Sequence, residues 1–216
     1  RQQTNTYDSY VACFTAGTRI QTPRGLVRIE DLSSGDAVIT EDGTKELSLV
    51  LSQVVNAERI ARNPKLRPVR ITAGALGRGK PERDLLVSPQ HRMLVTSNLS
   101  ERVTGERVAL IPAHRLTELP GIYIEDPKGD LKYVHLVFEA HEIVFAEGAP
   151  SESFYPGEQA VAGLPDAARE ELFGLFPSLA DGFVQPETAR SLPSAHVQRK
   201  LISRHVANDQ QLLQPT

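Results

Sequence analysis

Short apolar segments separated by turn residues fill the chain as far as Pro156 and Gly157. Strands of about four to eight residues with regular turn signals produce this pattern, so it favours an all-β body. Asp42-Gly43 is a strong hairpin signal within it. We expect strands over residues 26–32, 36–40, 46–55, 69–72, 84–87, 92–96, 107–111, 122–125, 131–138 and 142–145.

Beyond Gly157 the pattern becomes helical. Apolar residues recur at helical spacing and form a stripe along one face, which comprises Ala168, Leu172, Phe173, Phe176 and Leu179. Pro165 and Asp166 are suited to begin this helix, and Pro177 interrupts it near its end. A second, weaker helix is predicted over residues 195–206. We therefore expect a β domain followed by a helical extension whose stripe packs on that domain.

The composition is that of an ordinary globular domain. The 216 residues include 24 Lys and Arg against 27 Asp and Glu, a net charge of −3, and 40% are hydrophobic. This balance offers no broad basic surface for nucleic acid, and no apolar run approaches the roughly 18 residues of a membrane span. Cys13 is the only cysteine, which excludes an internal disulfide and a cysteine-rich zinc site but does not fix the compartment.

The surroundings of that cysteine are the most informative part of the chain. Cys13-Phe-Thr-Ala-Gly-Thr18 is followed by an Ile-Gln-Thr segment and then by Leu32-Ser-Ser-Gly-Asp-Ala-Val38. Further along lie Ser88-Pro-Gln-His91, the segment Tyr133-Val-His135-Leu, and His141 followed by Glu147-Gly148. In this order the three blocks resemble the Hedgehog/intein (Hint) family, in a form closest to the bacterial Hint-type domains. The resemblance spans Cys13 to about Tyr155.

The resemblance implies a fold and a reaction. The fold is an all-β, horseshoe-like Hint fold with pseudo-two-fold halves, and a faint echo between residues 27–32 and 108–116 agrees with such a duplication. The reaction is an N-to-S acyl shift, in which Cys13 attacks the carbonyl of Ala12 and converts the Ala12–Cys13 peptide bond to a thioester. It would make the chain a single-turnover, cysteine-dependent autoprotease that needs no cofactor and no metal.

Each candidate residue has an expected role in that reaction. The amine of Cys13 leaves only when protonated, and His91 is the natural general acid at the scissile nitrogen. Ser88 can orient that imidazole or donate to the carbonyl oxygen as charge develops there. His135 and His141 are expected across the cleft. One of them would assist thiol deprotonation, and the other would fix the loop that holds it.

The expected organisation follows from the scissile bond. Residues 1–12 form the upstream segment, residues 13–157 the autoprocessing domain and residues 158–216 a helical extension. The partners are an upstream polypeptide in cis and a small nucleophile, which can be water, a thiol or an amine. The domain is expected to be soluble, with no nucleic acid bound and no membrane span, and is compatible with a place in a larger secreted bacterial protein.

Several features bear on alternatives. A splicing intein ends in His-Asn, and no such ending follows Gly148, so full protein splicing is not expected. The same absence leaves open an inactive Hint module that serves as a structural or partner-binding domain. His91, His135 and His141 could converge on a metal, but no cysteine pair or metalloprotease spacing supports this. A papain-like protease would need a different cysteine context.

Overall fold

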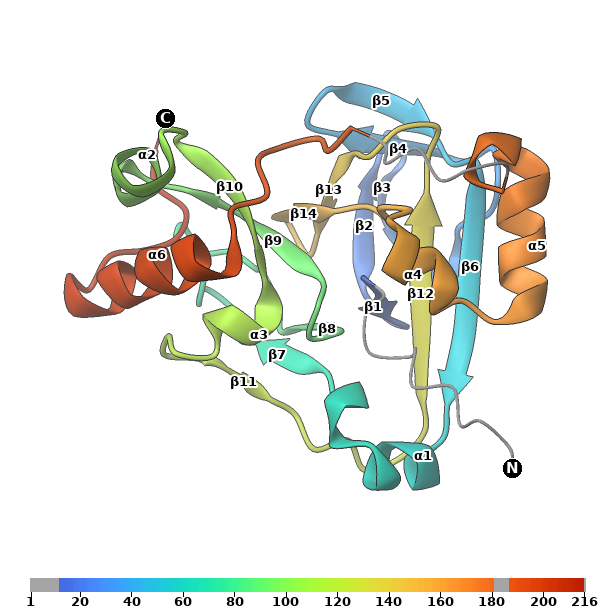
Figure 1. Cartoon of the computed structure of the whole chain (residues 1–216), viewed down its shortest axis with the longest axis horizontal. Coiled ribbons are helices and arrows are strands. Elements are labelled where there is room, and N and C mark those ends of the chain that lie inside the picture. Colours follow the sequence, from blue (N-terminus) through green and yellow to red (C-terminus); the bar gives the residue numbers. More distant parts are fainter. Residues whose placement is uncertain (1–11, 181–186, 216) are drawn as a thin grey trace.

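Two antiparallel β-sheets form the body of the protein in the computed structural model, which describes residues 12–180 and 187–215 (Figure 1). The six-stranded sheet has the order β11-β7-β8-β1-β12-β6. Its strands are β1 (Phe14–Thr15), β6 (Leu49–Val55), β7 (Val69–Ile71), β8 (Leu85–Val87), β11 (Ile122–Ile124) and β12 (Leu131–Val137). The short strand β1 therefore lies between β8 and β12, and this places the residues around Cys13 in the middle of the sheet.

The eight-stranded sheet has the order β10-β9-β14-β13-β2-β3, with β4 paired to β13 and β5 paired to β4. Its strands are β2 (Arg19–Thr22), β3 (Gly25–Arg28), β4 (Ala37–Thr40), β5 (Gly43–Glu46), β9 (Arg92–Thr96), β10 (Val108–Pro112), β13 (Ile143–Ala146) and β14 (Ala149–Glu152). Three antiparallel pairs, β10/β9, β14/β13 and β2/β3, follow one another across it. The echo seen in the sequence falls on the two outer strands, β3 and β10. Each leads directly into a short helical turn, η2 (Ile29–Asp31) and α3 (Ala113–Leu116).

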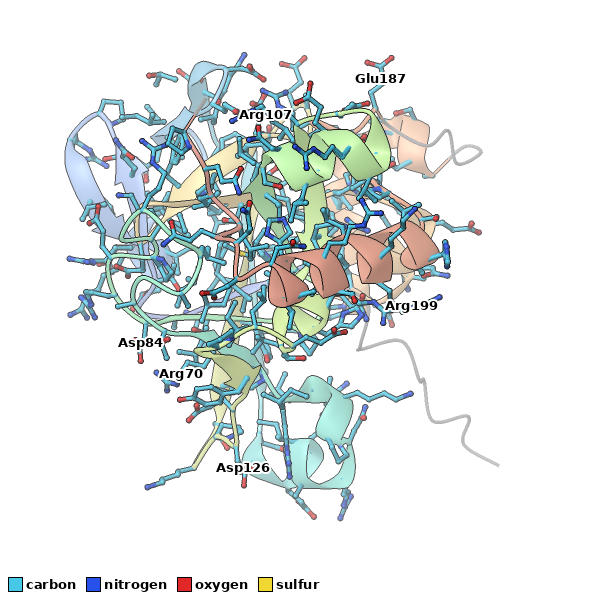
Figure 2. All side chains as sticks on the ribbon, turned by 90° about the vertical axis from the view of Figure 1, so that its left-hand side faces the viewer. Arg70, Asp84, Arg107, Asp126, Glu187 and Arg199 are labelled. Carbon is cyan, nitrogen blue, oxygen red and sulfur yellow. The ribbon has the colours of Figure 1, made fainter. Side chains whose placement is uncertain are left out.

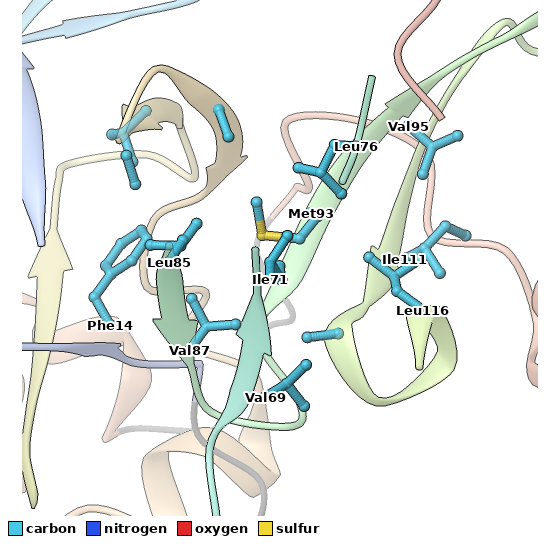
Figure 3. Close-up of a cluster of buried hydrophobic side chains, with 14 of the residues drawn as sticks. Phe14, Val69, Ile71, Leu76, Leu85, Val87, Met93, Val95, Ile111 and Leu116 are labelled. Atoms are coloured by element: carbon cyan, nitrogen blue, oxygen red, sulfur yellow. The ribbon is translucent and has the colours of Figure 1, made fainter. Parts of the chain in front are cut away.

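The main core lies between the strands that carry the cysteine segment and the second sheet. Phe14, Ile71, Leu85 and Met93 are completely or almost completely buried and belong to one cluster (Figure 3). Phe14 follows the cysteine directly, so burial of its ring holds Cys13 in place. Burying a side chain of this size contributes roughly 1.5–3 kcal/mol to folding.

The helices lie around these sheets. They are α1 (Ala57–Arg62), α2 (Asn98–Thr104), α3, α4 (Glu158–Ala162), α5 (Asp166–Leu175) and α6 (Ala195–Ala207), with 3-10 turns η2, η3 (Pro64–Leu66) and η4 (Pro177–Leu179). Among the described residues no helix is both long and apolar enough to cross a membrane.

The C-terminal extension packs on the β body at both ends, and the apolar stripe predicts the first of these contacts, that of α5. Leu172 of α5 is fully buried and shares a cluster with residues of β6 and β12, which α4 and α5 cover in Figure 1. Leu201 and Ile202 of α6 enter the main core, and Figure 2 shows α6 running across the face below α2. The chain then returns to β9, where the N–H of Thr96 donates to the carbonyl of Leu212 (2.9 Å).

Most expected strands are present, with shifted ends. The expected strand over residues 26–32 stops at Arg28, because Ile29–Asp31 turns into a 3-10 helix that buries Ile29. The expected strand over residues 46–55 was too long. The Asp42-Gly43 hairpin pairs Thr40 with Gly43, so Glu46 belongs to β5 and β6 begins at Leu49. Gly43 adopts φ +105°, a backbone conformation that favours glycine at this turn.

Candidate functional site

Cys13 lies at the centre of the candidate site, immediately before β1. Its side chain is only 3% exposed, and it belongs to the apolar cluster that also contains Phe154 of the β body and Val161 and Leu164 of the extension. Two bonds to Ser88 hold its backbone: the N–H of Cys13 donates to Ser88 Oγ (2.9 Å), and the carbonyl of Cys13 accepts from the N–H of Ser88 (2.9 Å). The Ser88 hydroxyl thus lies at the nitrogen of the Ala12–Cys13 bond.

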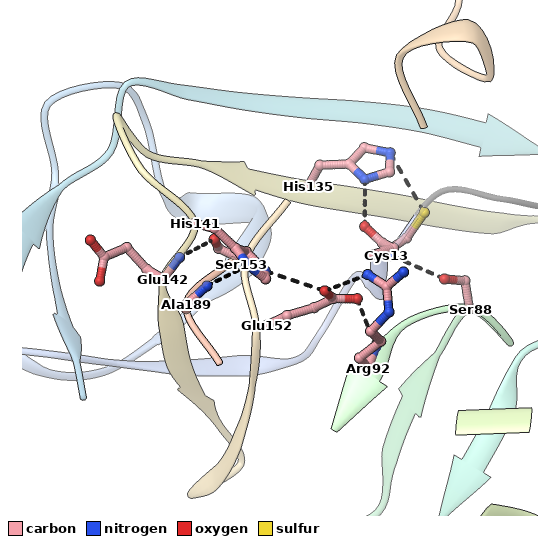
Figure 4. A network of polar contacts seen from close by, with 10 residues as sticks. Cys13, Ser88, Arg92, His135, His141, Glu142, Glu152, Ser153 and Ala189 are labelled. Carbon is pink, nitrogen blue, oxygen red and sulfur yellow. Dashed lines mark hydrogen bonds and ion pairs between the residues drawn. The ribbon is translucent and has the colours of Figure 1, made fainter. Parts of the chain in front are cut away.

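His135 joins the thiol to the carbonyl of the preceding residue. It lies in the middle of β12, the neighbour of β1, and is 2% exposed. Its Nε2 atom is 3.5 Å from Cys13 Sγ, and its Nδ1 atom is 2.8 Å from the carbonyl oxygen of Ala12 (Figure 4). A carbonyl oxygen can only accept, so Nδ1 carries the proton and Nε2 of the neutral ring has its lone pair toward the sulfur. The ring of Phe154 lies edge-on to His135, with centroids 5.5 Å apart.

Burial sets the resting protonation of this pair. It raises the pKa of the Cys13 thiol far above its ordinary value, and a hydrogen bond with Ser88 opposes the rise only in part. Burial lowers the pKa of His135 to about 4, with the bond to Ala12 acting the other way. At neutral pH the site therefore holds a protonated thiol and a neutral imidazole. The thiol needs a base to become nucleophilic, and the facing imidazole is free to accept its proton.

His91 lies on the other side of the cysteine segment. Its backbone N–H donates to the carbonyl of Ser88 (3.0 Å), and its ring lies against that of Phe14, with centroids 4.3 Å apart. The side chain is 1% exposed, and within the described part of the chain neither ring nitrogen has a hydrogen-bond partner. Burial lowers the pKa of His91 to about 4. A ring nitrogen that makes no hydrogen bond can give or take a proton without first breaking a contact.

His141 belongs to a different set of contacts. Its Nδ1 atom accepts from the backbone N–H of Ala189, in the extension, and its Nε2 atom lies 3.2 Å from Glu152 Oε2. Glu152 is fully buried and also pairs with Arg92, whose Nη1 atom is 3.0 Å away (Figure 4). The structure therefore brings Ser88 and His135 into contact with Cys13 and places His91 against the adjacent Phe14, whereas His141 lies in this neighbouring network.

Glu152 and Arg92 are polar residues beside the site that the sequence analysis did not single out. Arg92 could have been suspected because it follows His91 directly. Glu152 lies in the segment Ala149–Glu152, where Pro150 and Ser151 obscure the strand pattern of β14, so no periodicity marks it. Between residues 12 and 180 and between 187 and 215, no three His, Cys, Asp or Glu side chains are grouped closely enough to hold a metal ion.

A two-sheet β domain in which one imidazole joins a buried cysteine to the preceding carbonyl has the features of a domain that acts on its own backbone. Comparison with protein families agrees: the model of the Hint domain matches residues 12–158, and the chain belongs to the Hint domain family. The predicted all-β Hint fold with a helical C-terminal extension is thereby confirmed. Hint and intein domains generally self-process through a cysteine-mediated acyl shift.

Solved structures that resemble the chain include inteins and an intein-like domain. The gp41-1 intein has 15% sequence identity and a TM-score of 0.40, with 65% of this chain and 97% of that chain covered. A bacterial intein-like domain from Clostridium thermocellum has 16% identity and a TM-score of 0.41, with the same shares covered. No curated protein matches the chain.

Proposed function

We propose that this Hint domain cleaves its own Ala12–Cys13 peptide bond through an N-to-S acyl shift and resolution of the resulting thioester, without full protein splicing. The observation that carries the proposal is the position of His135, which contacts the nucleophile at 3.5 Å and the electrophile's oxygen at 2.8 Å. One side chain can then remove the thiol proton and stabilise the carbonyl oxygen. The reaction needs no group from outside the chain until the thioester is attacked.

In the first step the thiol proton passes to Nε2 of His135 while Sγ bonds to the carbonyl carbon of Ala12. The two movements are coupled, because burial disfavours both the free thiolate and the free imidazolium. The carbonyl π electrons move to the oxygen of Ala12, which becomes an oxyanion. Nδ1–H of the same ring, now an imidazolium, donates to that oxyanion in a charge-assisted bond.

In the second step the oxyanion reforms the carbonyl, and the bond between the carbon of Ala12 and the nitrogen of Cys13 breaks. The nitrogen takes the electron pair of that bond and needs a proton to leave as an amine. Ser88 Oγ lies 2.9 Å from this nitrogen, and its hydroxyl can donate to it once the nitrogen is tetrahedral. His91, three residues after Ser88 and acting in its protonated form, is the proposed source of the proton. The proton that His135 took from the thiol reaches the neutral His91 ring by way of solvent and passes from it to the amine, so both imidazoles end neutral.

In the third step a water, thiol or amine attacks the thioester carbonyl. The upstream polypeptide leaves on the nucleophile, whose proton goes to the departing sulfur, and Cys13 ends with a free thiol and a free α-amine. The downstream side stays joined. The segment after Gly148 carries no His-Asn pair, and Ala149–Glu152 is strand β14 in the middle of a sheet. Cleavage at one side only is therefore the outcome that the chain supports.

A reporter protein fused upstream of Arg1 tests the proposal. In the presence of a thiol, intact mass spectrometry is expected to show release of the reporter with residues 1–12 attached. Cys13→Ala must abolish the release. Persistent cleavage at Ala12–Cys13 in that variant would exclude the thioester route, and a second cut after Gly148 would contradict cleavage without splicing.

The alternative is an inactive Hint module that serves as a structural or partner-binding domain. One observation favours it: the thiol is buried, protonated and covered by the extension. This module would give no release with any nucleophile, and Cys13→Ala would leave partner binding and stability nearly unchanged. The fusion experiment separates the two candidates.

A further inference from the structure

A buried carboxylate lies next to the turn that presents His91. Glu152 accepts the backbone N–H of Arg92 at Oε1 (2.8 Å) and contacts the Arg92 guanidinium at Oε2 (3.0 Å). Its side chain has no exposed surface, while the side chain of Arg92 is 28% exposed. Glu152 is on β14 and Arg92 begins β9, so the contact joins two neighbouring strands. A carboxylate this deep is stable only with such partners.

His141 supplies the third contact of Glu152, and its tautomer is defined. The backbone N–H of Ala189 can only donate, so Nδ1 of His141 accepts and the neutral ring carries its proton on Nε2, which lies 3.2 Å from Glu152. Burial alone opposes ionisation of Glu152. The contact with His141 and the charge of Arg92 outweigh it and hold the pKa of Glu152 below its ordinary value. Glu152 is therefore an anion at neutral pH.

The same contacts fix the peptide bond that follows His91. Its carbonyl oxygen accepts from the N–H of Ala113 (2.8 Å), and its N–H, which belongs to Arg92, donates to Glu152. The turn before it is closed by the bond from His91 N–H to Ser88. The backbone on both sides of His91 is thus held. The His91 ring, in contrast, has no hydrogen-bond partner among the described residues.

We propose that Glu152 is a positioning residue for self-processing: it holds the backbone at His91 through the Arg92 N–H and its negative charge favours the protonated form of the His91 ring. The inference rests on the proposed function, in which His91 supplies the proton for the leaving amine. Glu152 contacts none of the reacting atoms and acts through His91.

The charges around His91 support this role. The groups that act on its ring are Glu152, His135, Arg92 and His141. Of these, Glu152 raises the pKa of His91, whereas the two histidines and the arginine lower it. Burial dominates and leaves the pKa at about 4, so the protonated form depends on whatever favourable charge the site provides. Removing the negative charge would make a poor proton donor poorer still.

The substitution Glu152→Gln separates charge from packing. Glutamine keeps the size of the side chain and an oxygen that can accept the Arg92 N–H, but it carries no charge. The matched control is Glu142→Gln, because Glu142 is also buried, lies beside His141 in sequence and directs its carboxylate away from the network in Figure 4. Cleavage of the upstream reporter is followed over pH in both variants and in the wild type.

We expect Glu152→Gln to slow cleavage at pH 7 by about tenfold for each unit by which the pKa of His91 falls, because the protonated fraction of His91 falls by the same factor. The pH profile is expected to move toward lower pH, while Glu142→Gln cleaves like the wild type. A folded Glu152→Gln protein with the rate and profile of the wild type would overturn the proposal. If Glu152→Gln fails to fold, Arg92→Gln takes its place: it keeps the backbone N–H that Glu152 accepts and removes a cation that lowers the pKa of His91. Cleavage at least as fast as that of the wild type is then expected, and cleavage about tenfold slower in the folded variant would overturn the proposal.

A titration of His91 by NMR in the non-cleaving Cys13→Ala background tests the effect of Glu152 on His91 separately from the cleavage reaction. The His91 ring is expected to be less protonated at pH 4 to 5 with Glu152→Gln than without it. An unchanged titration contradicts the role of Glu152 whether or not the domain cleaves. A changed titration, together with no release of the reporter by the protein that retains Cys13, supports the link from Glu152 to His91 and contradicts the proposed function instead.

Discussion

Nε2 of His135 lies 3.5 Å from Sγ of Cys13, across the pair of adjacent strands β12 and β1. The strand pairing fixes this distance, because Phe14 is in register with Val134, so the residue before Phe14 and the residue after Val134 are brought together. The same ring reaches the Ala12 carbonyl with its other nitrogen. The site therefore joins nucleophile, base and electrophile through one backbone register.

The contact predicts a large effect of replacing His135. In the upstream fusion, His135→Asn keeps a polar group but removes the base, and thiol-induced cleavage is expected to slow by about a hundredfold or more. Exposed His196 of α6 provides the control, and His196→Asn is expected to cleave at the wild-type rate. Similar rates for the two variants would show that His135 is not the base. Time courses of the released fragment on a denaturing gel measure both.

Removing the hydroxyl of Ser88 is expected to act at the other end of the scissile bond. Ser88→Ala leaves the N–H of Cys13 without its acceptor and removes a donor from the leaving nitrogen, so cleavage is expected to slow by about tenfold to a hundredfold. Ser34→Ala, which removes an exposed hydroxyl that is distant from Ser88 in the sequence, is the control. Circular dichroism melts establish that both proteins are folded. A Ser88→Ala rate equal to that of the control would remove Ser88 from the mechanism.

The packing of the extension predicts a contrast between two leucines of α5. Leu172 has no exposed surface, whereas Leu175 is 50% exposed. Leu172→Ala is expected to lower the free energy of unfolding by about 2–5 kcal/mol, because it leaves a cavity beside the cluster that contains Cys13. Leu175→Ala is expected to change it by less than about 0.5 kcal/mol. Equal effects in urea denaturation would contradict the docking of α5 on the β body.

The two buried histidines predict how stability depends on pH. Burial lowers the pKa of His91 and of His135 to about 4, from 6.5. The unfolded chain therefore binds protons that the folded chain does not, so stability is full above pH 6.5 and falls as the pH drops toward 4. The loss is on the order of 3 kcal/mol for each histidine.

Urea denaturation at pH 7 and pH 4.5 measures this loss in the Cys13→Ala background. His91→Gln is expected to remove a substantial part of the difference between the two pH values, since glutamine does not titrate. His196→Gln, at the exposed position, is expected to keep all of it. A pH dependence that is the same in all three proteins would show that His91 is not buried in its neutral form.

The sequence predicts the fold better than the details of the site. The short apolar run between Arg92 and Thr96 predicts β9 to the residue, and the stripe through Leu172 places α5 within a few residues. The segment Ala149–Glu152 was not predicted as a strand, because Pro150 and Ser151 break the alternation and only pairing with β13 and β9 makes it one. Helix α2 was missed for a related reason, since its buried residues Leu99 and Ser100 form no apolar stripe.

In the site, too, the residues could be predicted from the sequence but their contacts could not. The blocks around Cys13, Ser88 and His91 could be predicted because their order along the chain resembles a family. Which histidine faces the thiol could not, since it depends on whether residue 135 lies beside Cys13 across β12 and β1. The contacts of His141 with Glu152 and Ala189 arise from segments distant in sequence, and no local pattern indicates them.

The central claim is that a thioester forms between Ala12 and Cys13, and hydroxylamine tests it most directly. Hydroxylamine attacks a thioester and leaves a hydroxamate on the released fragment. Intact mass spectrometry of the upstream fusion is expected to find that fragment ending in an Ala12 hydroxamate with the wild type, and no fragment with Cys13→Ala. A fragment ending elsewhere, an equal yield from both proteins, or no fragment from the folded wild type would contradict the account.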